Sequence, residues 1–165
     1  MVEASTLTSG SSANDCNICG IILSGGPSSV YDVDSPHVHP SVWELISRYN
    51  IPVLGICYGM QELAYTFGGE VSPSKEREFG RAFVKKTNVS EDLQIADLLL
   101  KDINSSEGVQ MWMSHGDKVT KMPENFLKIA HTENSEHAAI ANPAKKMFGL
   151  QFHPEVTLHI CLFFL

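Results

Sequence analysis

The sequence predicts an α/β fold with an open, mostly parallel sheet and helices on both of its faces. Two short apolar runs, residues 20–23 and 51–57, stop at turn-forming residues, as strands buried on both faces do. Two stretches with helical spacing, residues 40–49 and 58–67, alternate with these runs. Strand, helix, strand and helix at these lengths form the βαβα pattern of a parallel sheet.

Start and stop signals support both helices. Pro40 and Ser41 give the first helix a start, and its apolar side chains recur at roughly helical spacing up to residue 49. The second helix follows Cys57 directly, and Gly68 and Gly69 end it. Its apolar residues recur at i, i+3, i+4 and i+7, which predicts one buried face: Met60, Leu63, Ala64 and Phe67.

The remainder of the chain is less regular. Residues 78–86 and 109–115 are predicted as strands, and residues 92–103 have a pattern compatible with a helix. Three later segments alternate enough to be strands of the sheet or of a β appendage: residues 126–132, 137–143 and 147–153.

The organisation predicted for the chain is one domain with two short ends. Residues 1–19 are rich in Ser, Thr, Asn and Gly and are expected to be a disordered leader. Residues 20–157 form the domain, and residues 158–165 form a short apolar tail that is too short to span a bilayer. With neither a secretion signal nor a membrane segment in the pattern, we expect a cytoplasmic protein.

Charge and cysteine spacing exclude some functions. The formal net charge of −7 argues against a binder of nucleic-acid backbones, which needs clustered Lys and Arg. Cys16 and Cys19 form a single C-x-x-C pair, and a structural zinc site needs four ligands. No second pair at ligand spacing follows, so we expect no metal site, and the sequence assigns this pair no role.

Cys57 lies where a buried strand is followed at once by a helix, between Gly55 and Gly59. This spacing is that of a nucleophile elbow, G-x-S-x-G, with Cys in place of Ser. A tight turn there strains the backbone and brings the sulfur near the free N–H groups at the start of the helix, which favour a thiolate and a developing oxyanion. A buried, inert cysteine is the alternative.

A base for this nucleophile is predicted in the segment Q-F-H-P-E-V. His153 and Glu155 are two residues apart, so on an extended backbone they would point to the same side. His153 would accept the thiol proton, and Glu155 would orient its ring. A surface His beside an unrelated Glu is the alternative. The glycine-rich loop Ser24–Pro27 lacks the features of a phosphate-binding loop and fits better as the second half of an oxyanion hole.

Four motifs in this chain resemble those of the class I (triad) glutamine amidotransferases. They are LSGGPSSVYD at 23–32, GICYGMQ at 55–61, WMSHGD at 112–117 and GLQFHPEV at 149–156, in the order and at nearly the spacing of that family. The Tyr after the cysteine, the SGGPSSVY loop and the SHGD segment are the forms typical of its GMP synthase members. The resemblance covers residues 20–157.

The resemblance implies a role for each matching residue. Cys57, His153 and Glu155 would form a catalytic triad that hydrolyses the side-chain amide of L-glutamine through a γ-glutamyl thioester. The oxyanion would be held by the backbone N–H groups of Gly26 and Tyr58. The remaining implied residues would contact the bound glutamine, through a side chain or through the backbone: Gln61, Ser114 and His115.

The resemblance also implies a flavodoxin-like sheet and a larger enzyme. In the family, a strand, a helix and a second strand precede the SGGP strand, and here only residues 1–19 stand in their place. GMP synthases continue into an ATP-pyrophosphatase (synthase) domain that binds ATP and Mg²⁺ and aminates XMP. That domain is the expected partner, and we expect this chain to need no cofactor, nucleic acid or membrane.

Two other interpretations follow from the same residues. Lacking the N-terminal elements, the chain would be a catalytically dead, truncated fragment that retains the motifs. Alternatively it would be another γ-glutamyl cysteine hydrolase of similar fold, although GICYGMQ, SHGD and FHPEV together argue against that.

Overall fold

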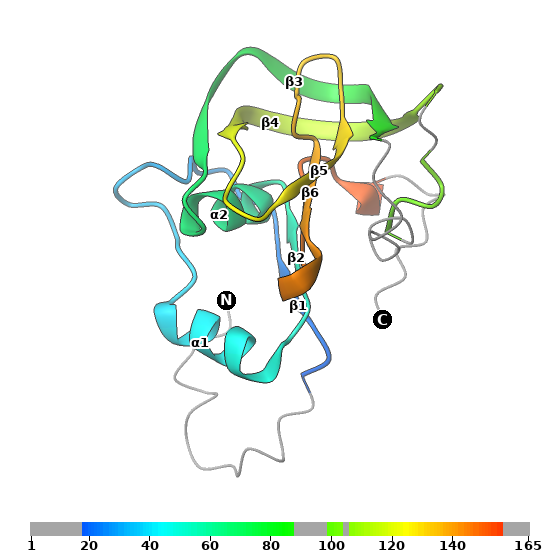
Figure 1. The fold of residues 1–165 in the computed structure, drawn as a ribbon. Helices are drawn as coiled ribbons and strands as arrows, with labels where there is room; N and C mark the ends of the chain where they lie inside the picture. Colours follow the sequence, from blue (N-terminus) through cyan, green and yellow to red (C-terminus); the bar gives the residue numbers. More distant parts are fainter. Residues whose placement is uncertain (1–17, 88–98, 104–105, 157–165) are drawn as a thin grey trace.

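The computed structural model describes residues 18–87, 99–103 and 106–156, which form an α/β structure around one mixed sheet (Figure 1). The seven strands of this sheet follow the order β1-β2-β7-β6-β5-β3-β4. The strands are β1 (Ile21–Leu23), β2 (Val53–Ile56), β3 (Glu70–Lys86), β4 (Val109–Lys121), β5 (Leu127–His131), β6 (Ala139–Asn142) and β7 (Met147–Leu150). The α/β class and the strands expected from the sequence are confirmed.

Only part of the sheet is parallel. β1 pairs with β2, and β2 with β7, in parallel register. The pairs β7–β6, β6–β5, β5–β3 and β3–β4 are antiparallel, so the expectation of a mostly parallel sheet is correct only around the cysteine. The links between β5, β6 and β7 are short, and a parallel connection requires a crossover of about a dozen residues or more.

Both predicted N-terminal helices are present. Helix α1 spans Pro40–Tyr49; its N-cap is His39, whose Nδ1 accepts from the Ser41 N–H, and its C-cap Asn50 is left-handed. Helix α2 spans Tyr58–Thr66 and begins immediately after Cys57. The chain leaves α2 through Gly68, whose φ of +82° suits a residue without a side chain.

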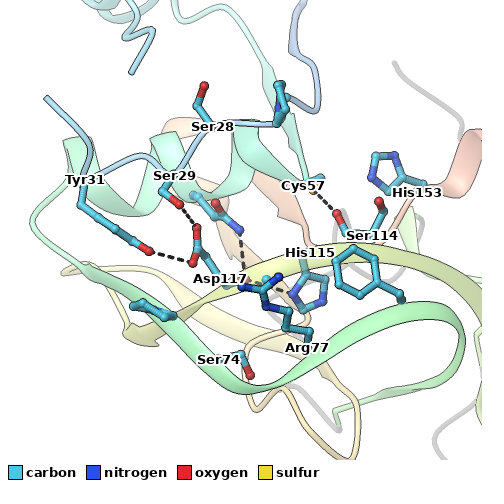
Figure 2. Close-up of a pocket in the computed structure, with 16 residues that line it drawn as sticks. Ser28, Ser29, Tyr31, Cys57, Ser74, Arg77, Ser114, His115, Asp117 and His153 are labelled. Atoms are coloured by element: carbon cyan, nitrogen blue, oxygen red, sulfur yellow. Dashed lines mark hydrogen bonds between the residues drawn. The ribbon is translucent and has the colours of Figure 1, made fainter. Parts of the chain in front are cut away.

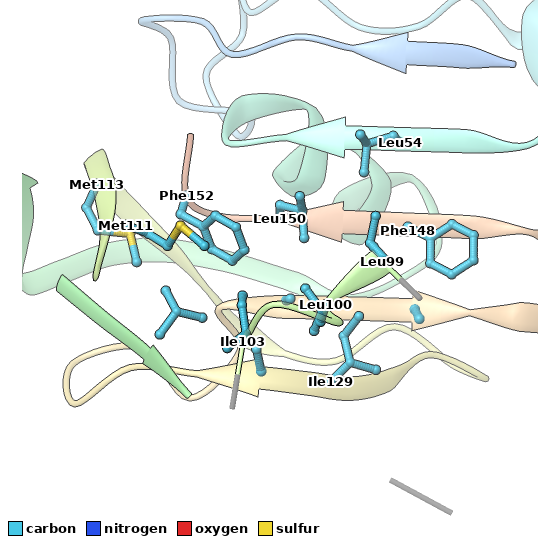
Figure 3. Close-up of a cluster of buried hydrophobic side chains, with 14 residues drawn as sticks. Leu54, Leu99, Leu100, Ile103, Met111, Met113, Ile129, Phe148, Leu150 and Phe152 are labelled. Atoms are coloured by element: carbon cyan, nitrogen blue, oxygen red, sulfur yellow. The ribbon is translucent and has the colours of Figure 1, made fainter. Parts of the chain in front are cut away.

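The sheet separates two buried clusters. Side chains of α1 and α2, including Ile46, Met60 and Leu63, pack with Val53 on one face. Leu54 is the next residue of β2 and points to the other face, where it joins Leu150 and residues 99–103 (Figure 3). Both described helices therefore cover the same face. The predicted helix at 92–103 falls largely outside the described residues.

The two longest strands, β3 and β4, form an antiparallel pair that lies across one end of the molecule in Figure 1. β3 begins at Glu70, eight residues before the predicted start, because pairing with the end of β4 extends it. A register shift between Pro73 and Glu78 then places Glu78 opposite His115 and Phe79 opposite Ser114. This pair of strands carries the SHGD segment toward the cysteine.

The predicted leader and tail lie almost entirely outside the described residues. None of the helices in the described ranges is long and apolar enough to cross a bilayer.

Candidate active site

Cys57 occupies the strained turn that the sequence predicts. Its backbone has φ 53° and ψ −105°, an unusual conformation for a residue with a side chain, between β2 and α2. A Cβ added to Gly55 would lie 2.4 Å from the carbonyl oxygen of Gly59, and one added to Gly59 would lie 2.0 Å from that of Leu23. Both glycines are thus required by close backbone approach, and the elbow is confirmed.

Polar groups from three segments of the chain surround the thiol of Cys57. Its Sγ donates to the Ser114 carbonyl oxygen of β4 at 3.7 Å, and the Gln151 amide donates to it at 3.9 Å. Burial raises the pKa of the Cys57 thiol, and the charges of Glu155 and Asp117 raise it further. The Tyr58 N–H and the Gln151 amide lower that pKa, because both donate toward the sulfur.

His153 and Glu155 form a close pair beside the cysteine. His153 Nδ1 lies 2.7 Å from Glu155 Oε1, with 18% of the His side chain and 56% of the Glu side chain exposed. The His153 N–H donates to the Trp112 carbonyl at 2.9 Å, which ties the segment after β7 to β4. The backbone around Glu155 is a 3-10 turn, Pro154–Val156, instead of the extended segment expected. The turn still allows the carboxylate to reach the ring.

Gly25 shows how close the ring of His153 lies to the cysteine. A Cβ built on Gly25 would lie 3.0 Å from His153 Cε1 and 3.6 Å from Cys57 Cβ. The loop after β1 therefore borders both side chains, and only a residue without a side chain leaves that space open. Three segments far apart in the sequence meet at this point.

A cavity of about 710 Å³ opens in front of the thiol (Figure 2). Six of the eight predicted site residues line it: Gly26, Cys57, Gln61, Ser114, His115 and His153. The other two residues contact residues that line the cavity: the Tyr58 N–H faces the sulfur of Cys57, and the Glu155 carboxylate contacts the ring of His153. The structure thus brings all eight together.

Gln61 holds the cavity wall through its side-chain amide. Its Nε2 donates to the Asp117 carbonyl at 3.1 Å and to Gln151 Oε1 at 3.3 Å. An amide nitrogen has two hydrogens, so both donors of Gln61 are engaged with the protein. Its Oε1 is therefore the atom with which Gln61 can meet a ligand, as an acceptor.

His115 is anchored away from solvent. Its Nε2 lies 3.0 Å from Glu78 Oε2, and both side chains are almost completely buried. Its Nδ1 faces the Asp117 carbonyl at 3.0 Å, and the Thr132 hydroxyl donates to the other oxygen of Glu78 at 2.9 Å. The imidazole thus ties the SHGD segment of β4 to Glu78 of β3.

Several lining residues were not predicted as site residues. The hydroxyls of Ser29 and Tyr31 both donate to the Asp117 carboxylate, which joins the loop after β1 to β4 (Figure 2). All three residues lie inside the four motifs quoted from the sequence, and their place in those motifs could have identified them as site residues. Arg77 and Phe79 also line the cavity, and the irregular sequence of β3 carries no signal for them.

The other predictions concern the pair Cys16 and Cys19 and the absence of a metal site. Cys16 lies outside the described residues, and Cys19 is exposed. Over residues 18–87, 99–103 and 106–156, no group of three or more His, Cys, Asp and Glu side chains is arranged to hold a metal ion.

The family model of the class-I glutamine amidotransferases matches residues 2–160 of this chain. A glutamine-hydrolysing GMP synthase of Prochlorococcus marinus subsp. pastoris is 48% identical over 153 residues, which cover 92% of this chain and 26% of that protein. A glutamine-hydrolysing GMP synthase of a Nitratiruptor species is 49% identical over 138 residues, 84% of this chain and 25% of that protein. The chain thus spans about a quarter of the length of these relatives.

Solved structures show the same fold. A glutamine amidotransferase of Methylobacillus flagellatus has a TM-score of 0.63 and 25% identity over 82% of this chain and 51% of that one. A glutamine amidotransferase of Thermotoga maritima has a TM-score of 0.61 and 26% identity over 80% of this chain and 55% of that one.

Proposed function

The chain belongs to the class-I glutamine amidotransferase family, and from this premise we propose that it hydrolyses L-glutamine to glutamate and ammonia at Cys57. The observation that carries the proposal is the cysteine elbow facing a His–Glu pair across Gly25. This arrangement supplies a nucleophile and a base that both line one cavity, and a group that orients the base.

In the first half of the reaction, His153 takes the thiol proton and Sγ attacks the side-chain amide carbon of glutamine. The proton then passes from His153 to the leaving nitrogen, which departs as ammonia, and a γ-glutamyl thioester remains on Cys57. In the second half, His153 takes a proton from water, and the resulting hydroxide attacks the thioester to release glutamate and the thiol. Glu155 holds the ring of His153 in orientation throughout.

The oxyanion of each tetrahedral intermediate needs donors close to Sγ. We assign this role to the backbone N–H groups of Tyr58 and Gly26. Tyr58 is the first residue of α2, where N–H groups have no partner within the helix, and its N–H already faces the sulfur. Gly26 lines the cavity from the facing loop.

The polar ends of the glutamine substrate are assigned to the far wall of the cavity. Ser114 and His115 line that wall, and we assign their backbone groups to the substrate. Gln61 would offer its Oε1 as an acceptor for an N–H of the substrate. The pairing of His115 with Glu78 fixes the position of this wall.

The ammonia would serve a synthase in a longer protein. The relatives named glutamine-hydrolysing GMP synthases are about four times as long as the stretch matched here. We therefore assign to the remainder of such a protein the ATP- and Mg²⁺-dependent amination of XMP to GMP, with this chain as the module that supplies ammonia.

Glutamine hydrolysis by the purified chain tests the proposal. Release of glutamate and ammonia is expected from the wild type and from Cys19→Ser, a substitution of an exposed thiol outside the cavity. Cys57→Ala should reduce the rate to the uncatalysed background. A folded wild type that releases no more ammonia than Cys57→Ala would contradict the proposal and favour a module that has lost its activity.

A further inference from the structure

Gln151 is a completely buried amide immediately after β7, with an exposed fraction of 0%. Its neighbours Leu150 and Phe152 belong to the apolar cluster on the sheet face opposite the helices. Burial of an amide is costly unless its donor and acceptor atoms are satisfied. The atoms that satisfy Gln151 therefore show what this side chain does.

The orientation of this amide is set by Gln61. Gln61 Nε2 donates to Gln151 Oε1 at 3.3 Å, so the oxygen of Gln151 faces Gln61 and its nitrogen faces away from it. That nitrogen lies 3.9 Å from Cys57 Sγ. Gln61 is itself held by the Asp117 carbonyl at 3.1 Å, so the row of contacts extends from β4 to the nucleophile.

We propose that Gln151 is a further residue of the catalytic centre, whose side-chain amide donates to Cys57 Sγ and stabilises the thiolate. Gln61 acts through it as a positioning residue that keeps the N–H aimed at the sulfur. The inference deepens the proposed glutaminase function and rests on it for its meaning, although the state of the thiol is measurable without glutamine.

The physical reason is that two hydrogen bonds of the sulfur change in strength when the thiol loses its proton. The protonated Sγ donates to the Ser114 carbonyl, and that contact is lost on ionisation because a thiolate has no hydrogen to donate. The contact with the Gln151 amide strengthens instead, because a hydrogen bond to a charged acceptor is stronger than one to a neutral acceptor. An N–H aimed at the sulfur thus offsets part of the penalty of burial.

Other charged or titratable groups also face this thiol. His153 and Glu155 approach it from the segment after β7, and Asp117 and His115 line the same cavity from β4. The carboxylates disfavour the thiolate, so their effect opposes that of the two N–H donors. A test must therefore change Gln151 while leaving these four side chains in place.

Alkylation of Cys57 by iodoacetamide as a function of pH provides that test. Incorporation is read by mass spectrometry on the peptide that contains Cys57, with exposed Cys19 of the same sample as the internal reference. Gln151→Met keeps the length of the side chain without the donor. In this variant the pH midpoint of Cys57 alkylation should rise, and the alkylation rate at neutral pH should fall about tenfold.

Two further variants separate the amide from general disruption. Gln151→Glu keeps the shape and replaces the donor with an acceptor, so its midpoint should rise at least as far. Gln61→Met leaves Gln151 in place and frees its orientation, so a smaller rise is expected. Gln110→Met, an exposed glutamine of β4, is the matched control and should leave the midpoint unchanged.

Circular dichroism and thermal melting identify the variants that fold, and midpoints are compared among those. A midpoint equal to that of the wild type in folded Gln151→Met or Gln151→Glu would overturn the inference. If neither folds, Gln61→Met decides in the same way. Because alkylation needs no glutamine, a chain without glutaminase activity but with the predicted shifts would contradict the proposed function and support the role of Gln151.

Discussion

The two halves of the sheet hold the candidate site by different means. The parallel half consists of short strands and positions Cys57 through its backbone, by a strained turn and two glycines that tolerate no side chain. The antiparallel half has strands of 17 and 13 residues and positions the opposite wall through side chains, chiefly the buried pair Glu78–His115.

The two halves should therefore differ in how strongly a substitution lowers stability. A backbone contact at van der Waals limits cannot relax without moving a strand or a helix. A side-chain pair can be replaced by another pair, provided that no buried charge is left without a partner. We therefore expect the smallest chemical change to have the largest effect in the parallel half.

The largest effect is expected for Gly59→Ala. The added methyl group would overlap the carbonyl of Leu23 at 2.0 Å, so β1 and α2 must separate. We expect a loss of about 3 kcal/mol or more in the free energy of unfolding, measured by chemical denaturation.

Gly116→Ala is the matched control on the antiparallel half. Its added Cβ would lie 3.6 Å from the nearest atom, on the flexible side chain of Arg77, and the change should stay within about 0.5 kcal/mol. Equal losses for the two variants would remove the distinction between the halves.

The next effect is expected at the buried pair. Glu78→Ala leaves His115 buried without its carboxylate and should lower the free energy of unfolding by about 3 kcal/mol. Glu70→Ala, on the same strand, breaks an exposed pair with Lys121 and should cost less than about 1 kcal/mol. If Glu70→Ala lowered the free energy of unfolding more than Glu78→Ala, burial would not determine how much these pairs stabilise the protein.

A smaller, pH-dependent effect follows from the same carboxylate. Burial raises the pKa of Glu78, but contacts with His115 and Thr132 outweigh it, and the net pKa lies below its usual value. A lowered pKa adds stability that is complete above the ordinary carboxyl range and is lost as pH falls through the lowered value.

The difference in unfolding free energy between the wild type and Glu78→Gln should therefore shrink as pH falls below about 4. Denaturation curves collected over that range measure it. A difference that grows toward acid pH would mean that the carboxyl is protonated more easily in the folded protein than in the unfolded one.

The smallest effect is expected where the two halves meet. Tyr31→Phe removes one of the two hydroxyl contacts that join the loop after β1 to Asp117. We expect a loss of about 0.5–1 kcal/mol in the free energy of unfolding. Tyr49→Phe, an exposed tyrosine at the end of α1, is the control and should change stability less. If the two losses are the same, this contact does not join the halves.

Sequence patterns predicted the parallel half closely. The run at 20–23, the helix at 40–49 and the turn at Cys57 all have local causes: apolar burial, capping and close approach of glycines. β3 was predicted eight residues short because its first part contains few alternating apolar residues and depends on pairing with β4. Local sequence patterns also could not predict the directions of β5, β6 and β7, because strand direction depends on how the connections cross the sheet.

The sequence by itself predicted eight residues of the candidate site, because local spacing indicates the turn at Cys57 and the pair of His153 and Glu155, and the family resemblance supplies the others. Tertiary structure alone decided which buried polar groups serve that site. Gln151 lies inside the motif GLQFHPEV but is assigned no role by it, and Glu78 lies outside the four motifs. Their contacts at the site are with Cys57 and His115, which are 94 and 37 residues away. Gln61 and Thr132, which complete these contacts, are also distant in sequence, so the folded arrangement of the strands assigns the roles of both residues.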